Sequence, residues 1–565
     1  MLKRIRIGVL FCAFFGIVGF CGAVFAGSSF DIFAFEGPKT KDLYYITMPD
    51  TDSQLLALLA GKLDVLSDIY RPKDVERLAQ LESVKVSVAQ SFHGFYVTFN
   101  TRKFPWDQTV LRQAASQVVE RERWTQDLFS HYSEPVSSFL PPLSPYYESV
   151  ETFPAGVEAA RKRLADAGWT WNREGWLVAP DGREAPVTKI LCPPSTVAAT
   201  SAEIALRMAK ALISIGVRAE ADLMDFQSLL ERVHNQDFDA CTNAWSMSRD
   251  PDNLFSFYHS SNDVKYGYNL SGIADPQLDA ALYDLRYAPD EARAREAISR
   301  ALKLLSELMP AIPIYSRYSI SAARADWDGL FVTNRVTIDN LFTLISMSPK
   351  QGGQRPIYWN IPEEIRVLNP LTSSTAYDWT VLSTIYDTLI SVNPENFEDM
   401  PWLAESWGIH TEGEKTVLTF TLRPGLKWQD GRPLTAEDAA YTLQFIKARE
   451  IPRFYERVKD IESITVEKQT LRVVMANTSF WHLRNIGGMP ILPKHILENV
   501  PDWQAWQPTN RSHAALDGAT LTELVGTGPF IFRKSRTGEY VHMSKNEYYF
   551  LSGGRSARNN TEDAQ

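Results

Sequence analysis

The clearest alternation of apolar and polar positions lies between Pro401 and Leu443. Leu418, Phe420 and Leu422 are separated by single threonines, so the apolar side chains recur at every second position. This period predicts a strand with one buried face.

Turn and helix signals follow that strand directly. Arg-Pro-Gly at 423–425 and Trp-Gln-Asp-Gly at 428–431 are typical of two successive turns. Thr435, with Asp438 three residues later, is a variant of the capping box and predicts a helix over 436–447. The stretch therefore predicts a strand, two turns and a capped helix.

The middle of the chain alternates between strand and helix patterns. Apolar runs at 187–192, 217–223 and 238–245 predict strands, and the segments between them, at 201–215 and 226–234, have helical periodicity. Such β-α-β-α-β alternation favours a parallel sheet with right-handed crossovers. The fold class is therefore predicted to be α/β.

Two cysteines fall on this predicted unit, Cys192 on its first strand and Cys241 on its third. We expect these strands to be neighbours, because the second strand commonly goes to the edge of the sheet. An exported protein could oxidise the pair. We nevertheless expect two buried free thiols, since adjacent parallel strands seldom offer the Cβ geometry of a disulfide.

The N-terminus has the pattern of an export signal. Basic residues precede the apolar run 7–20, and Val24 to Ala26 offers small residues where a signal peptidase cleaves. We predict a signal peptide over residues 1–26 and a periplasmic location. An uncleaved anchor is disfavoured because the run is short for a span of ~20 residues, and a lipoprotein site at Cys21 is disfavoured by the large residue before it.

Composition limits the possible function classes. A chain of 565 residues with 44% hydrophobic content can build two or three cores, and 58 basic against 68 acidic residues disfavour a nucleic-acid surface. Aromatic residues make up 12%, which suits either core packing or a ligand cleft lined with rings.

Enzyme and metal signatures are absent from the sequence. It has no Gly-x-Ser-x-Gly, no His-Glu-x-x-His and no glycine-rich phosphate loop, and its nine histidines lack metal-site spacing. We therefore predict no catalytic residue, no metal and no cofactor. A glycosidase-type carboxylate pair is left open, because sequence does not give carboxylate distances.

The stretch 401–443 resembles the signature of the extracellular solute-binding proteins that serve peptide, nickel and opine ABC importers. The matching motifs are Leu-Ala-Glu-Ser-Trp at 403–407, Phe-Thr-Leu-Arg at 420–423, Gly-x-Lys-Trp-x-Asp-Gly at 425–431 and Leu-Thr-Ala-Glu-Asp at 434–438. The resemblance implies a two-lobed, periplasmic-binding-protein-like α/β fold of the large, three-domain peptide-binding form (type II). It also implies a small peptide or peptide-like ligand, a membrane permease as partner, a monomeric state and no enzymatic activity.

The order of the motifs differs from that family. There the signature lies near the mature N-terminus, whereas here only about a quarter of the chain follows it. Gly-Thr-Gly-Pro-Phe at 526–530 and Asn-x-x-Tyr at 546–549 precede, in the family, the passage that resembles 42–66 of this chain. The resemblance therefore implies a circular permutant, with a fused, misassembled gene as the alternative.

The permutation implies a specific division of the chain. The segments are a first lobe from 27–97 and 340–550, a second lobe from 98–339, a linker at 348–355 that joins the ancestral termini, and a disordered tail at 551–565. We expect the chain to cross between the lobes near 96–100 and near 327–336.

The resemblance also implies a ligand site. Peptide-binding relatives present a carboxylate from a Trp-x-x-Asp motif to the ligand's α-amino group, but here Trp245 is followed by Ser248 in the place of the aspartate, then by Arg249 and Asp250. Trp245 is either a stacking wall or core, and Arg249 either an anion anchor or a surface residue. We expect anionic or N-blocked ligands, unless Asp250 replaces the missing carboxylate. The full predicted ligand-binding set is Phe92, His93, Asn369, Tyr377, Trp481, Thr527 and Gly528 from one lobe and Trp245, Ser248, Arg249 and Asp250 from the other.

The sequence thus predicts a binding protein that closes two lobes over a peptide or peptide-like solute by a hinge motion and delivers it to an ABC permease. A metal chelate, an opine or an oligosaccharide is the alternative ligand. A periplasmic hydrolase is the less favoured alternative function.

Overall fold

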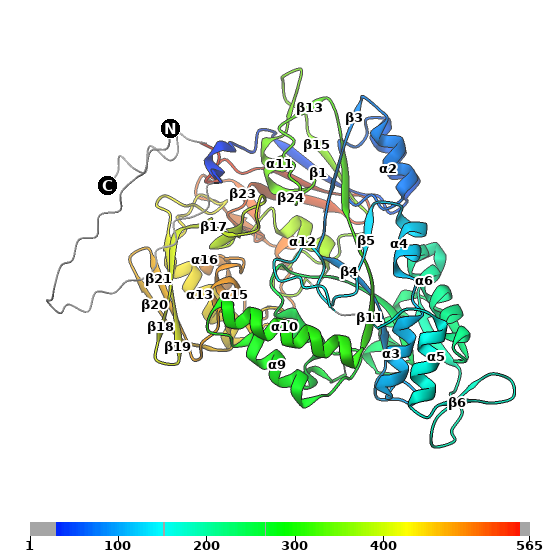
Figure 1. Cartoon of the computed structure of the whole chain (residues 1–565). Coiled ribbons are helices and arrows are strands. Elements are labelled where there is room, and N and C mark those ends of the chain that lie inside the picture. Colours follow the sequence, from blue (N-terminus) through cyan, green and yellow to red (C-terminus); the bar gives the residue numbers. More distant parts are fainter. Residues whose placement is uncertain (1–29, 151–152, 266, 374, 554–565) are drawn as a thin grey trace, which may run out of the picture.

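The computed structural model describes residues 30–150, 153–265, 267–373 and 375–553 (Figure 1). The predicted signal peptide 1–26 and residues 554–565 of the predicted tail lie outside this part of the chain. Within it, no helix combines the length and the apolar character needed to cross a bilayer.

A seven-stranded mixed sheet collects strands from the start, middle and end of the chain. β1 pairs with β15 in parallel and with β25 antiparallel, which places Leu43 beside Ile357 on one side and Met543 on the other. All three side chains are fully buried in one core. In order across the sheet, the strands are β24 (Phe530–Arg536), β25 (Tyr540–Lys545), β1 (Asp42–Thr47), β15 (Ile357–Ile361), β2 (Val65–Leu66), β12 (Ser319–Arg324) and β3 (Val84–Ala89).

A six-stranded sheet forms the second centre of the molecule, and it contains the predicted β-α-β-α-β unit. β8 pairs in parallel with both β10 and β9, and β9 lies at the edge, as predicted. The sheet order is β5 (Ser133–Pro135), β11 (Ala311–Arg317), β4 (His93–Phe99), β10 (Ala240–Ser246), β8 (Thr188–Cys192) and β9 (Ala219–Leu223), with crossover helices α6 (Ser195–Ser214) and α7 (Phe226–His234). We call this sheet and its helices the second lobe, and the seven-stranded sheet with the elements packed on it the first lobe.

Cys192 and Cys241 lie on neighbouring parallel strands, and both are buried free thiols, as predicted. Cys241 is in register with Leu191, so Cys192 is one position further along its strand. Because successive side chains of a strand point to opposite faces, the two sulfurs face different cores. This geometry explains why they do not bond.

A four-stranded antiparallel sheet packs on the first lobe and contains the strand predicted from alternation. It runs β18 (Ala404–Glu412), β19 (Lys415–Leu422), β21 (Thr470–Met475) and β20 (Ile461–Glu467). Helix α13 (Ala436–Ala448) begins with the predicted capping box, in which the Thr435 side chain accepts from the Asp438 backbone and the Asp438 carboxylate accepts from the Thr435 backbone. Both turns contain a glycine with positive φ, +73° at Gly425 and +83° at Gly431.

Shorter elements complete both lobes. On the first lobe these are α1 (Thr51–Leu59), α2 (Pro72–Ala79), β13 (Trp327–Asp328), α11 (Leu341–Ser346), β14 (Ser348–Pro349), α12 (Ala376–Leu382), β16 (Ile390–Val392), β17 (Asp399–Pro401), α14 (Tyr455–Val458), α15 (His482–Gly487), α16 (Lys494–Leu497), β22 (Ser512–Ala514) and β23 (Thr520–Thr522). On the second lobe they are α3 (Thr109–Gln117), α4 (Arg121–Phe129), α5 (Val157–Asp166), β6 (Thr170–Trp171), β7 (Leu177–Val178), α8 (Asn253–Tyr258), α9 (Pro276–Arg286) and α10 (Glu291–Leu308).

Three local features go beyond the sequence predictions or differ from them. The segment 109–129 forms two helices, α3 and α4, because the chain turns at 118–120 and thereby brings Val118, Val119 and Trp124 into one core. The stretch 348–355 is tied at both ends. Its first two residues form β14 against β13, and Arg355 pairs with Asp64 (3.1 Å) and Asp326 (2.9 Å).

The third feature is the position of the crossings between the lobes, which differs from the prediction. β3 and β4 belong to different sheets, and so do β11 and β12. The chain therefore crosses between sheets at 90–92 and at Tyr318, upstream of the expected 96–100 and 327–336, because β12 joins the first sheet beside β3 and β2.

Candidate functional site

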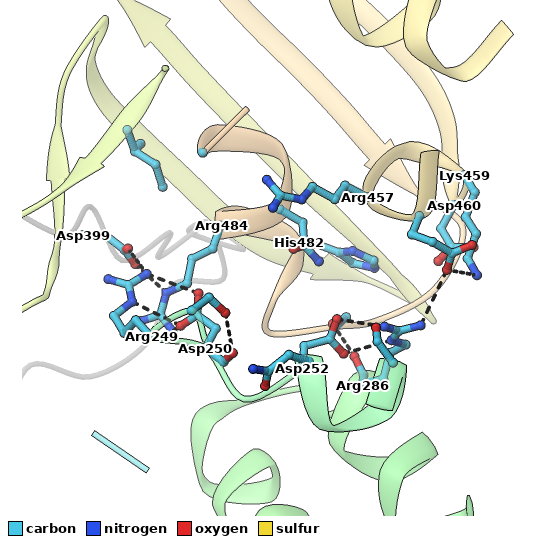
Figure 2. Close-up of a pocket in the computed structure, with 18 of the residues that line it drawn as sticks. Arg249, Asp250, Asp252, Arg286, Asp399, Arg457, Lys459, Asp460, His482 and Arg484 are labelled. Atoms are coloured by element: carbon cyan, nitrogen blue, oxygen red, sulfur yellow. Dashed lines mark hydrogen bonds and ion pairs between the residues drawn. The ribbon is translucent and has the colours of Figure 1, made fainter. Parts of the chain in front are cut away.

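A polar cavity of about 400 Å³ opens between the two lobes (Figure 2). The second lobe contributes 248–256 and the end of α9, and the first lobe contributes 390–399, 453–460 and 479–488. Charged side chains dominate the walls, which distinguishes this cavity from the apolar pockets that hold most small ligands.

Four of these charges close a ring across the lobes. Arg249 Nη2 donates to Asp399 Oδ1 (2.7 Å) and Arg484 Nε donates to Asp399 Oδ2 (3.0 Å). Arg484 Nη1 donates to Asp250 Oδ1 (2.7 Å), and Arg249 Nε donates to the same oxygen (3.1 Å). Each side chain thus contacts two of opposite sign, and the ring is neutral. Arg249 and Asp250 follow β10 of the second lobe, whereas Asp399 is on β17 and Arg484 on α15 of the first.

A second group of charges lies along the same cavity. Arg286, the last residue of α9, donates to both carboxylate oxygens of Asp252 (2.9 and 3.1 Å). Its guanidinium is also 3.6 Å from Glu456 of the first lobe, which pairs with Lys459 at 2.8 Å. The two lobes are therefore linked by opposite charges at both groups (Figure 2).

The segment before α15 makes uncharged contacts with the second lobe. Ser479 Oγ donates to the carbonyl of Arg286 (2.7 Å), and Trp481 Nε1 donates to the carbonyl of Leu285 (2.8 Å). Trp481 is 1% exposed and packs in a core of the second lobe. It was predicted to line the ligand cleft, but its ring is a packing element between the lobes.

Of the predicted ligand-binding residues, Ser248, Arg249 and Asp250 line the cavity. Ser248 is exposed and its hydroxyl donates to the Asp250 carbonyl (2.8 Å). Arg249 was expected to be either a free anion anchor or a surface residue, and it is neither, because its guanidinium is buried between Asp250 and Asp399. Trp245 stacks on Phe257 with 4.6 Å between ring centroids and does not line this cavity.

Other predicted residues are brought near the lobe boundary without reaching the cavity lining. Phe92 packs against Phe397 with ring centroids 5.3 Å apart. His93 lies on the strand that enters the second lobe, and its burial lowers its pKa to about 4. Tyr377 is half-buried, and burial raises its pKa.

Asn369, Thr527 and Gly528 have structural roles. Asn369 Nδ2 donates to the carbonyls of Trp503 (3.0 Å) and Trp506 (2.9 Å), which holds a loop. A Cβ at Gly528 would lie 2.4 Å from the Thr384 carbonyl oxygen, so this position requires glycine. Thr527 is buried, and its hydroxyl donates to Asp387 (2.7 Å).

Asp387 and Asp339 face a second cavity, of about 390 Å³, which shares Ser391 with the first. Burial raises the pKa of Asp387 to about 6, although its carboxylate accepts hydrogen bonds from Trp402 (2.8 Å) and from Thr527. Burial also raises the pKa of Asp339. Among the described residues that line this acidic cavity there is no Arg, Lys or His.

One cluster contains residue types that bind metals. Asp430 Oδ2 accepts from His495 Nε2 (2.9 Å) and His513 Nε2 (2.7 Å), and these three groups are the donors a zinc site would use. Arg432 also contacts the Asp430 carboxylate and His513, so a guanidinium occupies the space beside these donors. The arrangement acts as a charge-assisted tie between the 428–432 turn, α16 and β22.

Sequence reasoning missed Asp399, Arg484, Arg286 and Arg457. Asp399 is separated from Arg249 by 150 residues and Arg484 from Asp250 by 234. No local motif in the sequence therefore predicts the ring. The sequence contains only one local indication of the ring, the Arg-Asp pair at 249–250, and the partners of this pair depend on how the lobes meet.

Comparisons with known proteins identify several proteins to which this chain is similar. The chain is 24% identical to a probable di/tripeptide-binding protein 5 of Pseudomonas aeruginosa, over 52% of this chain and 53% of that protein. It is 23% identical to the oligopeptide-binding protein AppA of Bacillus subtilis, over 50% and 52% of the two chains. The structure of that AppA in complex with a nonapeptide aligns with a TM-score of 0.47 at 21% identity, over 53% of this chain and 59% of that one. The chain thus spans about half the length of the curated relatives it matches.

The family comparison covers more of the chain. Residues 31–266 and 399–561 match the model described as "Bacterial extracellular solute-binding proteins, family 5 Middle". The two matched blocks include β10 with Arg249 and Asp250, and β17 and α15 with Asp399 and Arg484. The chain therefore belongs to family 5 of the bacterial extracellular solute-binding proteins.

Proposed function

We propose that this protein is the solute-binding component of an ABC importer, which captures a peptide or peptide-like solute between its lobes and delivers it to a membrane permease. The observation that carries the proposal is the charged cavity, whose walls come from both lobes. Relatives named as di/tripeptide- and oligopeptide-binding proteins support the peptide class.

The ring of four charges supports a closing motion. Two rigid lobes joined by only two crossings, at 90–92 and Tyr318, can rotate about those crossings. Rotation that separates the lobes breaks the Arg249–Asp399 and Arg484–Asp250 contacts, while closure restores them. The side chains of the ring are only 9–21% exposed, and for such pairs the cost of removing the charges from water offsets much of their attraction, so opening, which returns them to water, costs little net free energy.

The proposal also describes the protein as a periplasmic monomer without catalytic activity. The family is a binding family, and four carboxylates of the cavity, those of Asp250, Asp252, Asp399 and Glu456, are in ion pairs with arginine. A carboxylate held in this way is stabilised as the anion and is a poor proton donor. A hydrolase would instead need one carboxyl group whose pKa is raised next to the scissile bond.

The direct test is to identify what the protein binds. The full chain is expressed in a bacterial host, the purified protein is denatured, and the released small molecules are identified by mass spectrometry. We expect short peptides or peptide-like compounds, recovered intact after incubation with the protein. A released metal chelate, opine or oligosaccharide would favour the alternative ligand classes, and turnover of a released peptide would contradict a binding role.

A second test follows closure. Small-angle scattering of the protein, stripped by partial unfolding and refolding, should show a smaller radius of gyration after the identified solute is added. An unchanged radius at saturating solute would contradict capture between moving lobes.

A further inference from the structure

We propose that Arg457 is the anion-binding group of the interlobe cavity, and that the captured solute carries a carboxylate or an equivalent anionic group that pairs with it. This inference rests on the proposed function and specifies the substrate class of the same site. Arg457 is on α14 (Tyr455–Val458) of the first lobe, and its side chain lines the cavity (Figure 2).

Most charges of the cavity are paired with one another, and among the described charged residues that line it only Arg457 and Asp460 have no hydrogen bond or ion pair from their side chains. Arg249 and Arg484 are satisfied by Asp250 and Asp399, Arg286 by Asp252 and Glu456, and Lys459 by Glu456. Arg453 donates to the carbonyl of Ser373 (3.3 Å) and lies 4.4 Å from the ring centroid of Trp379. Arg457 alone among the described arginines of the cavity has no hydrogen bond or ion pair from its side chain.

The surroundings of Arg457 strengthen the binding of an anion to its guanidinium. The Arg457 side chain is exposed to the cavity, although the protein atoms around it lower its pKa, and Asp252 and Asp250 act on the pKa in the opposite direction without contacting the guanidinium. Those two carboxylates are already occupied by Arg286 and by the ring. A partly desolvated guanidinium gains more from a charge-assisted pair than one in bulk water does.

A like charge nearby points to the same ligand chemistry. Arg453 lies in the turn before α14, both arginines line the cavity, and burial and the charge of Arg457 both lower the pKa of Arg453. Two neighbouring guanidiniums are unfavourable together without a shared counter-ion. Arginine's planar fork matches a carboxylate in two-point geometry, which makes a carboxylate-bearing solute the best fit.

The adjoining acidic cavity is unsuited to an anion, in contrast to the cavity at Arg457. Asp339 and Asp387 face it without a basic lining residue, so an anion there would meet only like charge. A solute that extends past Ser391, which lines both cavities, therefore has its anionic end at Arg457 and not at the other end. This assigns to Arg457 the anchor role that the sequence suggested for Arg249.

The test compares two synthetic tripeptide libraries of identical composition, one with free C-terminal carboxylates and one with C-terminal amides. Each library is mixed with the full-length protein, and the retained peptides are quantified by mass spectrometry. The variants are Arg457→Gln, Arg457→Lys, which keeps the charge but loses the fork, and Arg449→Gln, which removes an exposed arginine that does not line the cavity. Thermal unfolding checks that all variants fold.

For the unchanged protein we expect the free acids to be enriched roughly tenfold to a hundredfold over the amides, as loss of one partly desolvated charge pair implies. Arg457→Gln should reduce this preference to within about twofold, Arg457→Lys should retain part of it, and Arg449→Gln should retain all of it. A preference that survives in Arg457→Gln, or is absent from the unchanged protein, overturns the proposal while peptide binding stands.

A third probe separates this inference from the proposed function. If neither library is retained, peptide capture is wrong, and citrate, a tricarboxylate, then tests the anion site by itself. Citrate should raise the unfolding temperature of the unchanged protein and of Arg449→Gln but not that of Arg457→Gln. Equal shifts in all three proteins would overturn the anion site as well.

Discussion

Two charge clusters of this protein use the same chemistry in different places. In the first lobe, Asp430 is fully buried and accepts from His495, His513 and Arg432. At the lobe boundary, the ring of Arg249, Asp250, Asp399 and Arg484 has side chains that are 9–21% exposed. The first cluster joins segments within one core, and the second joins two bodies that each have their own core.

Because of this difference, one cluster affects the stability of the fold and the other affects how far apart the lobes lie. When the first lobe unfolds, the hydrogen bonds of Asp430 break and its partners become solvated. This cluster therefore contributes to the free energy of unfolding. Opening the lobes costs the ring and the contacts of Trp481, whose ring is buried against the second lobe, while the rest of both cores remains packed. We therefore expect substitutions in the Asp430 cluster to change stability, and substitutions in the ring to change the distance between the lobes.

Replacing Asp430 with alanine should have the largest effect. It leaves the two histidines and Arg432 without their shared acceptor and opens space at a fully buried position. We expect the free energy of unfolding to fall by about 3 kcal/mol in urea denaturation. Glu405→Ala, which removes an exposed carboxylate, serves as the control and should change it by less than about 0.5 kcal/mol. Similar values for the two variants would contradict a stabilising role for the cluster.

Acid should act through the same cluster. The hydrogen bonds from His495, His513 and Arg432 outweigh burial and hold the pKa of Asp430 well below its usual range. A carboxyl group with a lowered folded-state pKa stabilises the fold above its unfolded pKa of about 4, and this contribution is lost as the pH falls further. Urea denaturation at pH 7, 5, 4 and 3 should therefore show a steeper loss of stability for the unchanged protein than for Asp430→Asn.

Asp387 should affect the pH dependence of stability in the opposite direction. Its burial raises the pKa to about 6, so its proton stabilises the folded state at low pH and this contribution disappears as the pH rises through 6. Asp387→Asn should thus flatten the profile between pH 4 and 6 and leave the acid limb below pH 4 unchanged. A variant that changes only the acid limb would contradict the assignment.

Neutralising both acids of the ring should open the lobes at little cost in stability. In the double variant Asp250→Asn with Asp399→Asn, Arg249 and Arg484 face each other without a counter-charge. Because opening the lobes returns both guanidiniums to water, they are not left buried without a partner, so we expect the unfolding free energy to change by less than about 1 kcal/mol, while the radius of gyration from small-angle scattering increases. Asp166→Asn, which breaks the exposed Lys162–Asp166 pair, should change neither quantity. An unchanged radius in the double variant would show that Trp481 and its neighbours hold the lobes without the ring.

The comparison also shows what the sequence can predict. Strand β19, the capping box of α13 and the parallel β8–β10 pair follow from periods and caps within a few tens of residues, and all three were predicted. The break between α3 and α4 was not, because it depends on core packing around Val118 and Val119 rather than on a local signal.

The site was predicted only in part, for the same reason. The segment Ser248 to Asp250 was located because it occupies a recognisable motif position. Asp399 and Arg484 were not, since their partners lie far away in the chain and meet only when the lobes close. Trp481 was assigned to the cleft because aromatic residues suit ligand walls, but its indole hydrogen bond to Leu285 shows that it packs the boundary instead.

The smallest effect is expected from changing the order of the chain, which tests the proposed circular permutation. The backbone nitrogen of Gly37 donates to the Leu551 carbonyl at 3.2 Å, and β25 pairs directly with β1, so the two ends of the described fold already touch. The exposed stretch 350–354 is the proposed junction of the ancestral ends. A rearranged gene that starts at Arg355, joins Leu551 to Phe30 through a Gly-Ser linker and ends at Lys350 keeps every residue of both charge clusters, and also the buried Ile32 and the phenylalanines packed around it.

Because packing and not chain order holds these clusters, we expect the rearranged protein to match the original in circular dichroism, in solute affinity and, within about 1 kcal/mol, in unfolding free energy. Opening the chain inside β19 instead, with the same linker, breaks a central strand of the four-stranded sheet and should prevent folding. If the rearranged protein fails as this control does, then the two blocks depend on their present order, and both clusters owe their geometry to the 350–354 connection rather than to packing alone.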